Sequence, residues 1–285
     1  MKYFTMVLSK QEMNHLEQTF EKFFTDNNNE HVLFSAVHNN VEIIGYKSGK
    51  LLLRGKELQS EILLIKRILN RTDFEAIGSD EVGTGDLFGP IVVCAAYVTV
   101  EDIEFLESLN VRDSKSVNDK YIIKYAPMIA KRLTHSLIIL NPSKYNKSIE
   151  EGYNLNKVKA LLHNQALVSL AQKINNKPVP VIVDQFCQPH LYFNYIKDEI
   201  MIYRDIQFHT KAENVHIAVA AAAIIARYAF LYSMQRYSRK LKVRLVKGAS
   251  KAADDQLQEI IALHGKDILP KIAKMNFRNI TKLDL

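Results

Sequence analysis

The chain has 285 residues, of which 47% are hydrophobic and 24% charged, so it has the length for two domains and the composition of a globular protein. No apolar run approaches a membrane span and no apolar signal core opens the chain, which predicts a soluble, cytoplasmic protein without a membrane partner. Its two cysteines, Cys94 and Cys187, cannot form an all-cysteine zinc site and favour a reduced compartment.

The net charge is +7 and the isoelectric point is near 9.1. This balance is typical of a protein with a polyanionic partner such as nucleic acid, and equally of an ordinary basic protein. Part of the charge is concentrated in "YKSGKLLLRGK", residues 46–56, which contains no acid. Its basic residues are Lys47, Lys50, Arg54 and Lys56.

The first part of the chain predicts a small α+β domain. Residues 2–8 are typical of a strand, and Ser9 with Glu12 forms a capping box that starts a helix. Three short strands at 31–37, 41–46 and 50–55 follow, joined by turn residues, and an apolar-striped helix covers 58–69. We place the domain boundary near residues 70–73, which gives domains at 1–70 and 71–285.

The second part predicts an α/β fold with a mixed sheet flanked by helices. Strands at 74–80 and 90–100 follow each other directly, so they form an antiparallel pair. Further strands are expected at 135–140, 179–184 and 206–208, and helices at 101–109, 119–134, 156–174, 189–200 and 214–241, with one or two more at the end. The alanine run 220–223 suits close approach of the last long helix to a sheet.

The stretch "GSDEVGTGDLFGP", residues 78–90, matches no nucleotide or calcium loop. A dinucleotide fingerprint leads into a helix, whereas Pro90 and a β-branched run follow here. A P-loop ends in Gly-Lys-Ser/Thr, which is absent, and an EF-hand counted from Asp80 would put Val82 and Ile91 at ligand positions. What remains is the pair Asp80 and Glu81 at a strand end beside a glycine-rich loop.

Four carboxylates at the ends of predicted elements could form one site. Asp80 and Glu81 could instead be a solvated acidic turn, Asp184 a helix cap after the strand "VPVIVD", and Glu213 a first-turn acid of the alanine-rich helix. Taken together, they are hard oxygen ligands of the kind that Mg²⁺ or Mn²⁺ prefers. By strand alternation Glu81 faces away from Asp80, so the strand is expected to end or twist there.

The histidines and cysteines support no rival chemistry. There is no His-Glu-x-x-His motif for zinc and no Gly-x-Ser-x-Gly elbow for a serine nucleophile. His163 lies in an amphipathic helix and is more typical of a packed or surface residue than of a base.

These motifs resemble the ribonuclease HIII family of type 2 ribonucleases H. The similarity begins at "IGSDEVGTGDLFGP" and continues in order through "RDSKSVND", "KALLHNQAL", "VIVDQF", "TKAENVHIAVAAAAIIARY" and "LVKGAS", so it spans nearly all of residues 74–285. The N-terminal part resembles the TBP-like domain of that family. Ribonuclease HII lacks such a domain and usually has Arg where this chain has Thr84. The family commonly has Tyr at Leu87, a position that could touch the substrate.

The resemblance implies an RNase H-like fold and endonucleolytic cleavage of the RNA strand of RNA–DNA hybrids. It assigns catalysis and the binding of two Mg²⁺ or Mn²⁺ ions to Asp80, Glu81, Asp184 and Glu213. It implies in-line attack by an ion-bound water, which leaves a 5′-phosphate and a 3′-hydroxyl. Incision at single ribonucleotides, as in ribonuclease HII, and non-catalytic nucleic-acid binding remain alternatives.

The resemblance also suggests where the hybrid is held, and it implies no protein partner, so a monomer is expected. Backbone amides of the glycine loop would approach the scissile phosphate, and the ribose 2′-hydroxyl would distinguish RNA from DNA. Two lysines and the basic N-terminal cluster would contact other phosphates, although each could be a plain solvated residue. The full set of substrate-binding candidates is Gly83, Thr84, Gly85, Lys115, Lys211, Lys47, Lys50, Arg54 and Lys56.

Overall fold

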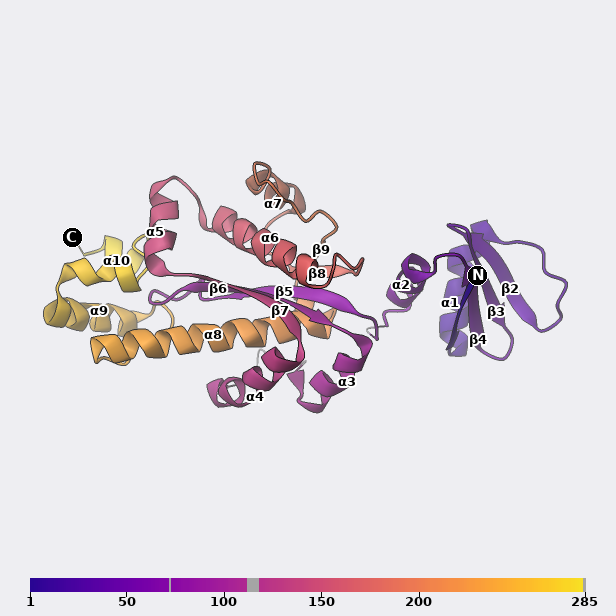
Figure 1. Cartoon of the computed structure of the whole chain (residues 1–285), viewed down its shortest axis with the longest axis horizontal. Helices are drawn as coiled ribbons and strands as arrows, with labels where there is room; N and C mark the ends of the chain where they lie inside the picture. The colour runs from indigo at the N-terminus through magenta and orange to yellow at the C-terminus, as the bar shows by residue number, and fades with distance from the viewer. Residues whose placement is uncertain (72, 112–117, 284–285) are drawn as a thin grey trace. The chain divides into compact units, whose positions relative to one another are not determined.

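A four-stranded antiparallel sheet, with helices packed on one face, forms the N-terminal unit of the chain (Figure 1). The computed structural model describes residues 1–71, 73–111 and 118–283, and it divides the chain into two units, Met1–Phe74 and Glu75–Leu285. The strand order of this first sheet is β1-β4-β3-β2. Its elements have the predicted order: β1 (Lys2–Val7), α1 (Lys10–Phe20), β2 (Val32–His38), β3 (Val41–Tyr46), β4 (Lys50–Gly55) and α2 (Gln59–Ile68).

Local sequence signals explain these elements. Ser9 caps α1 as predicted: its hydroxyl accepts a hydrogen bond from the backbone N–H of Glu12 at 3.3 Å, and the Glu12 carboxylate accepts one from Ser9 N–H at 2.8 Å. Alternation along β4 places Leu51 and Leu53 in the core with α1, while Lys50 is exposed on the opposite face. The sheet therefore has one face covered by helices and one face that carries basic residues.

The C-terminal unit contains a five-stranded mixed sheet with the order β7-β6-β5-β8-β9. β5 pairs with β6 and β6 with β7 in antiparallel fashion, as predicted for the first pair, whereas β5–β8 and β8–β9 are parallel. The strands are β5 (Ala76–Val82), β6 (Ile91–Val98), β7 (Thr134–Leu140), β8 (Val181–Asp184) and β9 (Gln207–His209). The helices are α3 (Val100–Ser108), α4 (Asp119–Arg132), α5 (Pro142–Glu150), α6 (Leu155–Lys173), α7 (Pro189–Tyr195), α8 (Ile217–Leu241), α9 (Lys251–His264), α10 (Leu269–Ile272) and α11 (Arg278–Thr281).

Helices cover both faces of this sheet, with α8 on one side and α6 on the other (Figure 1). Along β6, Val92 and Cys94 pack on the side of α8 and α4, and Val93 and Ala95 pack on the side of α6. A strand buried on both faces reads as a continuous apolar run, which is what the sequence of β6 shows. Two hydrophobic cores thus enclose the strands that carry Asp80 and Asp184.

Helix α8 is also long and apolar enough to cross a membrane by length and composition, so the expectation that no run approaches a span is wrong. However, 67% of its most apolar window is buried inside the protein. Core helices pass the same length test, because a helix that is covered on several sides is apolar around most of its circumference.

α8 approaches β5 very closely at Gly78. A Cβ atom at this position would lie 2.2 Å from the backbone carbonyl carbon of Ala218 and 2.2 Å from the backbone nitrogen of Val219. Glycine is therefore required here by the backbone of the helix, and the small residues of its first turns allow the contact. This contact brings the N-terminal end of α8 beside the strand that carries Asp80.

Two local predictions differ from the structure. β5 does not end or twist at Asp80 but continues in regular pairing to Val82, opposite Val92. Helix α5 was not expected, although its start has a clear signal: the Asn141 side chain accepts a hydrogen bond from Lys144 N–H at 2.9 Å, and Pro142 occupies the first turn.

We expect Gly78→Ala to lower the free energy of unfolding by about 3 kcal/mol, because a methyl group pressed against backbone atoms must displace α8. Gly85→Ala is the matched control, since a Cβ there meets nothing within 4 Å. Urea unfolding of both variants measures the difference. Equal stability of the two variants would contradict the close contact.

Candidate active site

Asp80 projects from β5 toward α8 into a cavity of about 230 Å³. Val82, two residues on, lines the same cavity, as alternation requires. Glu213 and Arg227 also line it, the first from the turn before α8 and the second from α8 itself. Two of the four predicted acids therefore share one small cavity, whose other lining residues are mostly apolar.

A hydrogen bond to the backbone holds Asp184 beside the turn that carries Glu213. Asp184 is the last residue of β8, and its Oδ1 accepts a hydrogen bond from the backbone N–H of Ala212 at 2.9 Å. Ala212 and the buried Glu213 lie in a short 3₁₀ turn, which Lys211 enters with a left-handed backbone, φ 55°. Lys211 itself is exposed.

The electrostatics show that the acids lie near one another. The pKa of Asp80 is raised well above its ordinary value, first by burial, then by the negative charge of Glu81 and, more weakly, by those of Asp184 and Glu213. A hydrogen bond from the Glu81 backbone N–H to Asp80 Oδ1, at 2.7 Å, opposes this shift without cancelling it. Like charges that are partly buried together favour a proton or a cation among them.

Glu81 lies on the opposite face of β5, where α6 binds it. Lys159 Nζ donates to Glu81 Oε1 at 2.9 Å, and His163 Nε2 lies 2.9 Å from Oε2. The side chains of Glu81, Lys159 and His163 are 12%, 10% and 0% exposed, so this is a buried ion-pair network. The structure brings Asp80, Asp184 and Glu213 together and pairs Glu81 with α6 instead.

The network continues behind His163. Its Nδ1 lies 2.8 Å from Ser79 Oγ, and the Ser79 hydroxyl donates its single proton to the carbonyl oxygen of Cys94 at 3.1 Å. The Glu81 carboxylate can only accept, so His163 Nε2 is the donor in that hydrogen bond. Phe186 stacks on the His163 ring at 5.3 Å between centroids.

These partners fix the charge of Glu81. Burial alone would raise its pKa, but the hydrogen bond and charge of His163 and the charge of Lys159 outweigh burial and lower the pKa to about 2. Adjacent residues of one strand thus have opposite shifts: Asp80 is pushed toward its protonated form and Glu81 is held ionised.

The donor set fits a hard divalent cation, although the ligands are not gathered in advance. Within residues 1–71, 73–111 and 118–283, no group of three or more His, Cys, Asp or Glu side chains is close enough to hold an ion as it stands. Asp184 and Glu213 nevertheless lie near enough for their charges to act on Asp80, and the repulsion felt at Asp80 is what a cation would relieve.

The glycine loop is anchored by the C-terminal part of the unit. Gly83 has φ +94° and its Cβ would lie 2.2 Å from the carbonyl oxygen of Pro90, so packing alone requires glycine there. Gly85 is exposed with open space around it, and Thr84 is half-buried. The buried ammonium of Lys274 donates to the carbonyl oxygens of Asp86 and Gly89 at 2.6 and 2.9 Å.

Other predicted contacts have mixed outcomes. Leu87 is fully buried, so the idea that this position touches substrate is wrong. In the N-terminal unit Arg54 is paired with the neighbouring Glu42, whereas the side chains of the predicted lysines are exposed. These are Lys47, Lys50 and Lys56. Lys115 lies outside the described residues.

Lys159 and His163 were missed as functional candidates. Both lie in "KALLHNQAL", where their spacing of four residues puts them on one face of a helix. That spacing was a usable signal, because a Lys and a His on a face that must pack against a sheet require a buried partner.

A family model and known relatives agree with this geometry. Residues 77–280 match the family described as ribonuclease HII, and residues 4–63 match a domain of unknown function, DUF3378. The sheet and its acids thus define a ribonuclease H. A ribonuclease HIII from Phytoplasma mali is 46% identical over 99% of this chain and 98% of its own length. One from Bacillus pumilus is 36% identical over 96% of each chain. The chain belongs to the ribonuclease HIII family.

Solved structures extend the match to the whole fold. Bst-RNase HIII in complex with Mn²⁺ is 37% identical and superimposes with a TM-score of 0.73, covering 99% of this chain and 97% of its own. Aquifex aeolicus RNase H3 is 25% identical with a TM-score of 0.62, over 96% of this chain and 99% of its own. Both units therefore have counterparts in these structures.

We expect Asp80→Asn to raise the melting temperature in metal-free buffer at about pH 8. A carboxyl with a raised folded-state pKa favours folding below its unfolded pKa, and this stability is lost as pH rises through the folded pKa. An amide does not ionise, so the variant does not lose this stability at high pH. The rise in its melting temperature should therefore vanish near about pH 4. Thermal melts across this range, with the exposed Asp255→Asn as control, decide the matter; a gain independent of pH would contradict it.

We expect Lys159→Met to lower the free energy of unfolding by about 3 kcal/mol, because it removes one partner of a buried carboxylate. Adding Glu81→Gln should restore much of the loss, since the uncompensated charge is then gone. Urea unfolding of the single and double variants measures this coupling. Lys147→Met breaks the exposed pair with Glu151, whose side chains are 76% and 52% exposed, and should cost under about 1 kcal/mol. Strictly additive effects of the two buried substitutions would disprove the coupling.

Proposed function

We propose that this chain is an endoribonuclease that hydrolyses the RNA strand of RNA–DNA hybrids and leaves 5′-phosphate and 3′-hydroxyl ends. The observation that carries the proposal is the proximity of Asp80, Asp184 and Glu213 at one edge of the sheet, with the pKa of Asp80 raised by burial and by the charges of the other acids. Family membership supports the same reaction.

The carboxylates are proposed to hold two divalent ions, Mg²⁺ or Mn²⁺. When bound, such ions activate a water molecule and stabilise the leaving 3′ oxygen. Asp80 and Glu213 would contribute oxygens from their shared cavity, and Asp184 would contribute the oxygen that Ala212 does not engage. Glu81 enters the proposal as a fixed negative charge beside them, since Lys159 and His163 keep it ionised.

Residues around the acids would position the hybrid. The exposed Gly85 leaves a backbone segment without side chain next to half-buried Thr84, where a ribose and its phosphate could approach main-chain amides. Lys211, exposed two residues before Glu213, is suited to a neighbouring phosphate. Lys115 belongs to the same proposal on the strength of its motif alone.

The N-terminal unit is proposed as a TBP-like substrate-binding domain. Lys47, Lys50 and Lys56 supply exposed positive charge, and phosphate contacts of this kind give affinity that falls with salt. Arg54 contributes less net attraction, because Glu42 neutralises it. We further propose that the protein acts as a monomer in the cytoplasm.

We expect Asp184→Asn to reduce hybrid cleavage by at least about 10³-fold while hybrid binding stays within about threefold, because one neutral amide replaces an essential charged ligand without removing phosphate contacts. Gel cleavage assays with Mg²⁺ and with Mn²⁺, beside binding measured by fluorescence anisotropy, test both halves. Asp198→Asn, a substitution after α7, is the control. Full activity of Asp184→Asn would refute the assigned site.

The choice of substrate separates the proposal from its alternatives. A duplex with a stretch of four ribonucleotides should be cut, and a duplex with one embedded ribonucleotide should be a poor substrate. Preferential incision of the single ribonucleotide would indicate activity of the ribonuclease HII kind. Binding of the hybrid without any cleavage by the unaltered protein would indicate a non-catalytic role.

A further inference from the structure

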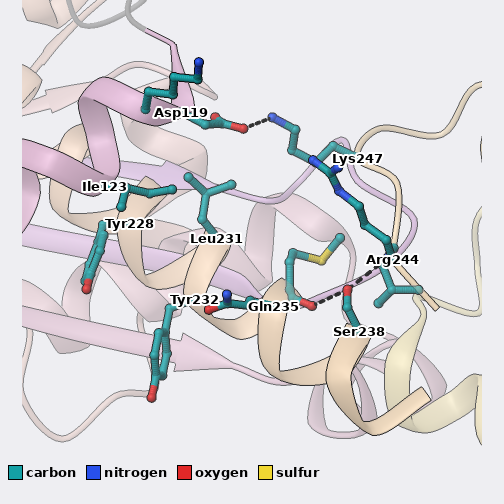
Figure 2. A pocket seen from close by; sticks show the side chains of 12 residues that line it. Asp119, Ile123, Tyr228, Leu231, Tyr232, Gln235, Ser238, Arg244 and Lys247 are labelled. Carbon is teal, nitrogen blue, oxygen red and sulfur yellow. Dashed lines mark hydrogen bonds and ion pairs between the residues drawn. The ribbon is translucent and has the colours of Figure 1, made fainter. Parts of the chain in front are cut away.

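A second, larger cavity of about 610 Å³ lies between α4, α8 and the segment that follows α8 (Figure 2). Its volume is in the range of small-molecule and nucleotide sites. Asp119 and Lys120 border it from the first turn of α4, Tyr228 and Tyr232 from α8, and Arg244 from the segment after α8. Among the described residues, none of those predicted to bind substrate lines this cavity.

The cavity carries a net positive charge. Asp119, the one acid among the described residues that line it, accepts from Arg227 Nη2 at 2.8 Å and from Lys247 Nζ at 2.5 Å, so two cations share its charge. In the described part of the chain, Lys120 and Arg244 are exposed and have no ion-pair partner. Two exposed cations around a concave surface favour an anionic ligand.

The wall formed by α8 is aromatic and accessible. Tyr228 and Tyr232 lie one helical turn apart, so they share a face, and Tyr232 is 55% exposed. Ile123 of α4, which lies near Tyr228 in Figure 2, is 58% exposed. Exposed aromatic rings beside cations are the combination that nucleic-acid strands use, with phosphates on the cations and sugars or bases against the rings.

This cavity and the smaller cavity that contains Asp80 and Glu213 are bordered by the same two helices. α8 contributes Ile224 and Arg227 to the first cavity and Tyr228 to the second, while α4 contributes Ile122 to the first and Ile123 to the second. The Arg227–Asp119–Lys247 ion pairs run from one cavity to the other. Both cavities are thus bordered by α4 and α8, one further along α8 than the other, and the stretch of surface that bears them is called the groove below.

The length of the groove matches several nucleotides. From Ala223 in the first cavity to Ser238 in the second, α8 advances by fifteen residues, or about 22 Å at 1.5 Å per residue. A strand in a duplex advances about 3.4 Å per nucleotide, so this distance corresponds to about six nucleotides.

We propose that the cavity at Lys120, Tyr232 and Arg244 is a second nucleic-acid subsite, which binds the sugar-phosphate backbone of one strand of the hybrid and reaches to about six nucleotides from the cavity that contains Asp80. The inference rests on the proposed function, because it takes the hybrid as the ligand. It adds a binding surface on the catalytic unit itself, independent of the basic N-terminal unit. The groove then binds longer hybrids more tightly, because a short hybrid contacts the acids alone and a longer one contacts both cavities.

The test is hybrid binding by the full-length double variant Lys120→Ala/Arg244→Ala, measured by fluorescence anisotropy in EDTA so that no cleavage occurs. We expect affinity to fall about tenfold or more and the slope of log Kd against log salt to decrease by about 2, one for each lost phosphate contact. Tyr232→Ala should weaken binding without changing the salt slope, because the ring carries no charge. Neither loss should appear with a hybrid of about four base pairs, which is too short to span the groove.

The matched control is Lys131→Ala/Arg204→Ala, which removes the same charges from an exposed position at the far end of α4 and an exposed position before β9. Affinity and salt slope of the test variant equal to those of the control would overturn the subsite. Loss of affinity for a free nucleoside diphosphate with unchanged hybrid binding would also overturn it, in favour of a nucleotide site. If the unaltered protein cleaves hybrids in either case, the proposed function survives; failure of the unaltered protein to cleave or bind them would refute the function instead.

Discussion

The contact between α8 and β5 at Gly78 is the constraint on which the rest of the catalytic unit depends. Because the helix backbone lies against the strand without any side chain between them, the turn before α8 is drawn to the edge of the sheet. That turn carries Glu213 and gives its Ala212 amide to Asp184. A bulkier residue at position 78 would move the helix and the turn that carries Glu213, so packing alone sets how near this turn lies to β5 and β8.

Alternation along β5 divides the two adjacent acids into different electrostatic environments. Asp80 enters a cavity with other acids and has a raised pKa, while Glu81 meets Lys159 and His163 on the other face and has a lowered one. The two shifts are related: a Glu81 that is kept ionised by its own partners adds to the repulsion at Asp80. The sheet therefore maintains a negative potential at its edge that a divalent cation would satisfy, and it does so without placing all four carboxylates on one face.

The motifs predicted the fold, because strand periodicity, helix caps and element ends are local properties of the sequence. They also predicted all four acids as one set, of which the structure places Asp80, Asp184 and Glu213 near one another and pairs Glu81 with α6. The partners of Glu81 were harder to predict, since Lys159 and His163 meet it across more than seventy residues of chain and only the sheet order β6-β5-β8 brings α6 over that strand. The expectation that β5 ends or twists at Asp80 failed for a related reason. It assumed that Asp80 and Glu81 bind the same metal ions, whereas burial on both faces of the sheet allows each acid its own partners.

The length and composition of α8 now have a second explanation besides core packing. Its first turns are small and apolar, because they lie against β5, but from Tyr228 onward one face carries aromatic and other larger side chains and borders the second cavity. A helix that only filled the core would have no need of an exposed ring at Tyr232. One rigid element thus begins at the acids and ends at a cationic surface about 22 Å away, and this fixed distance makes a hybrid of defined length a better ligand than its parts.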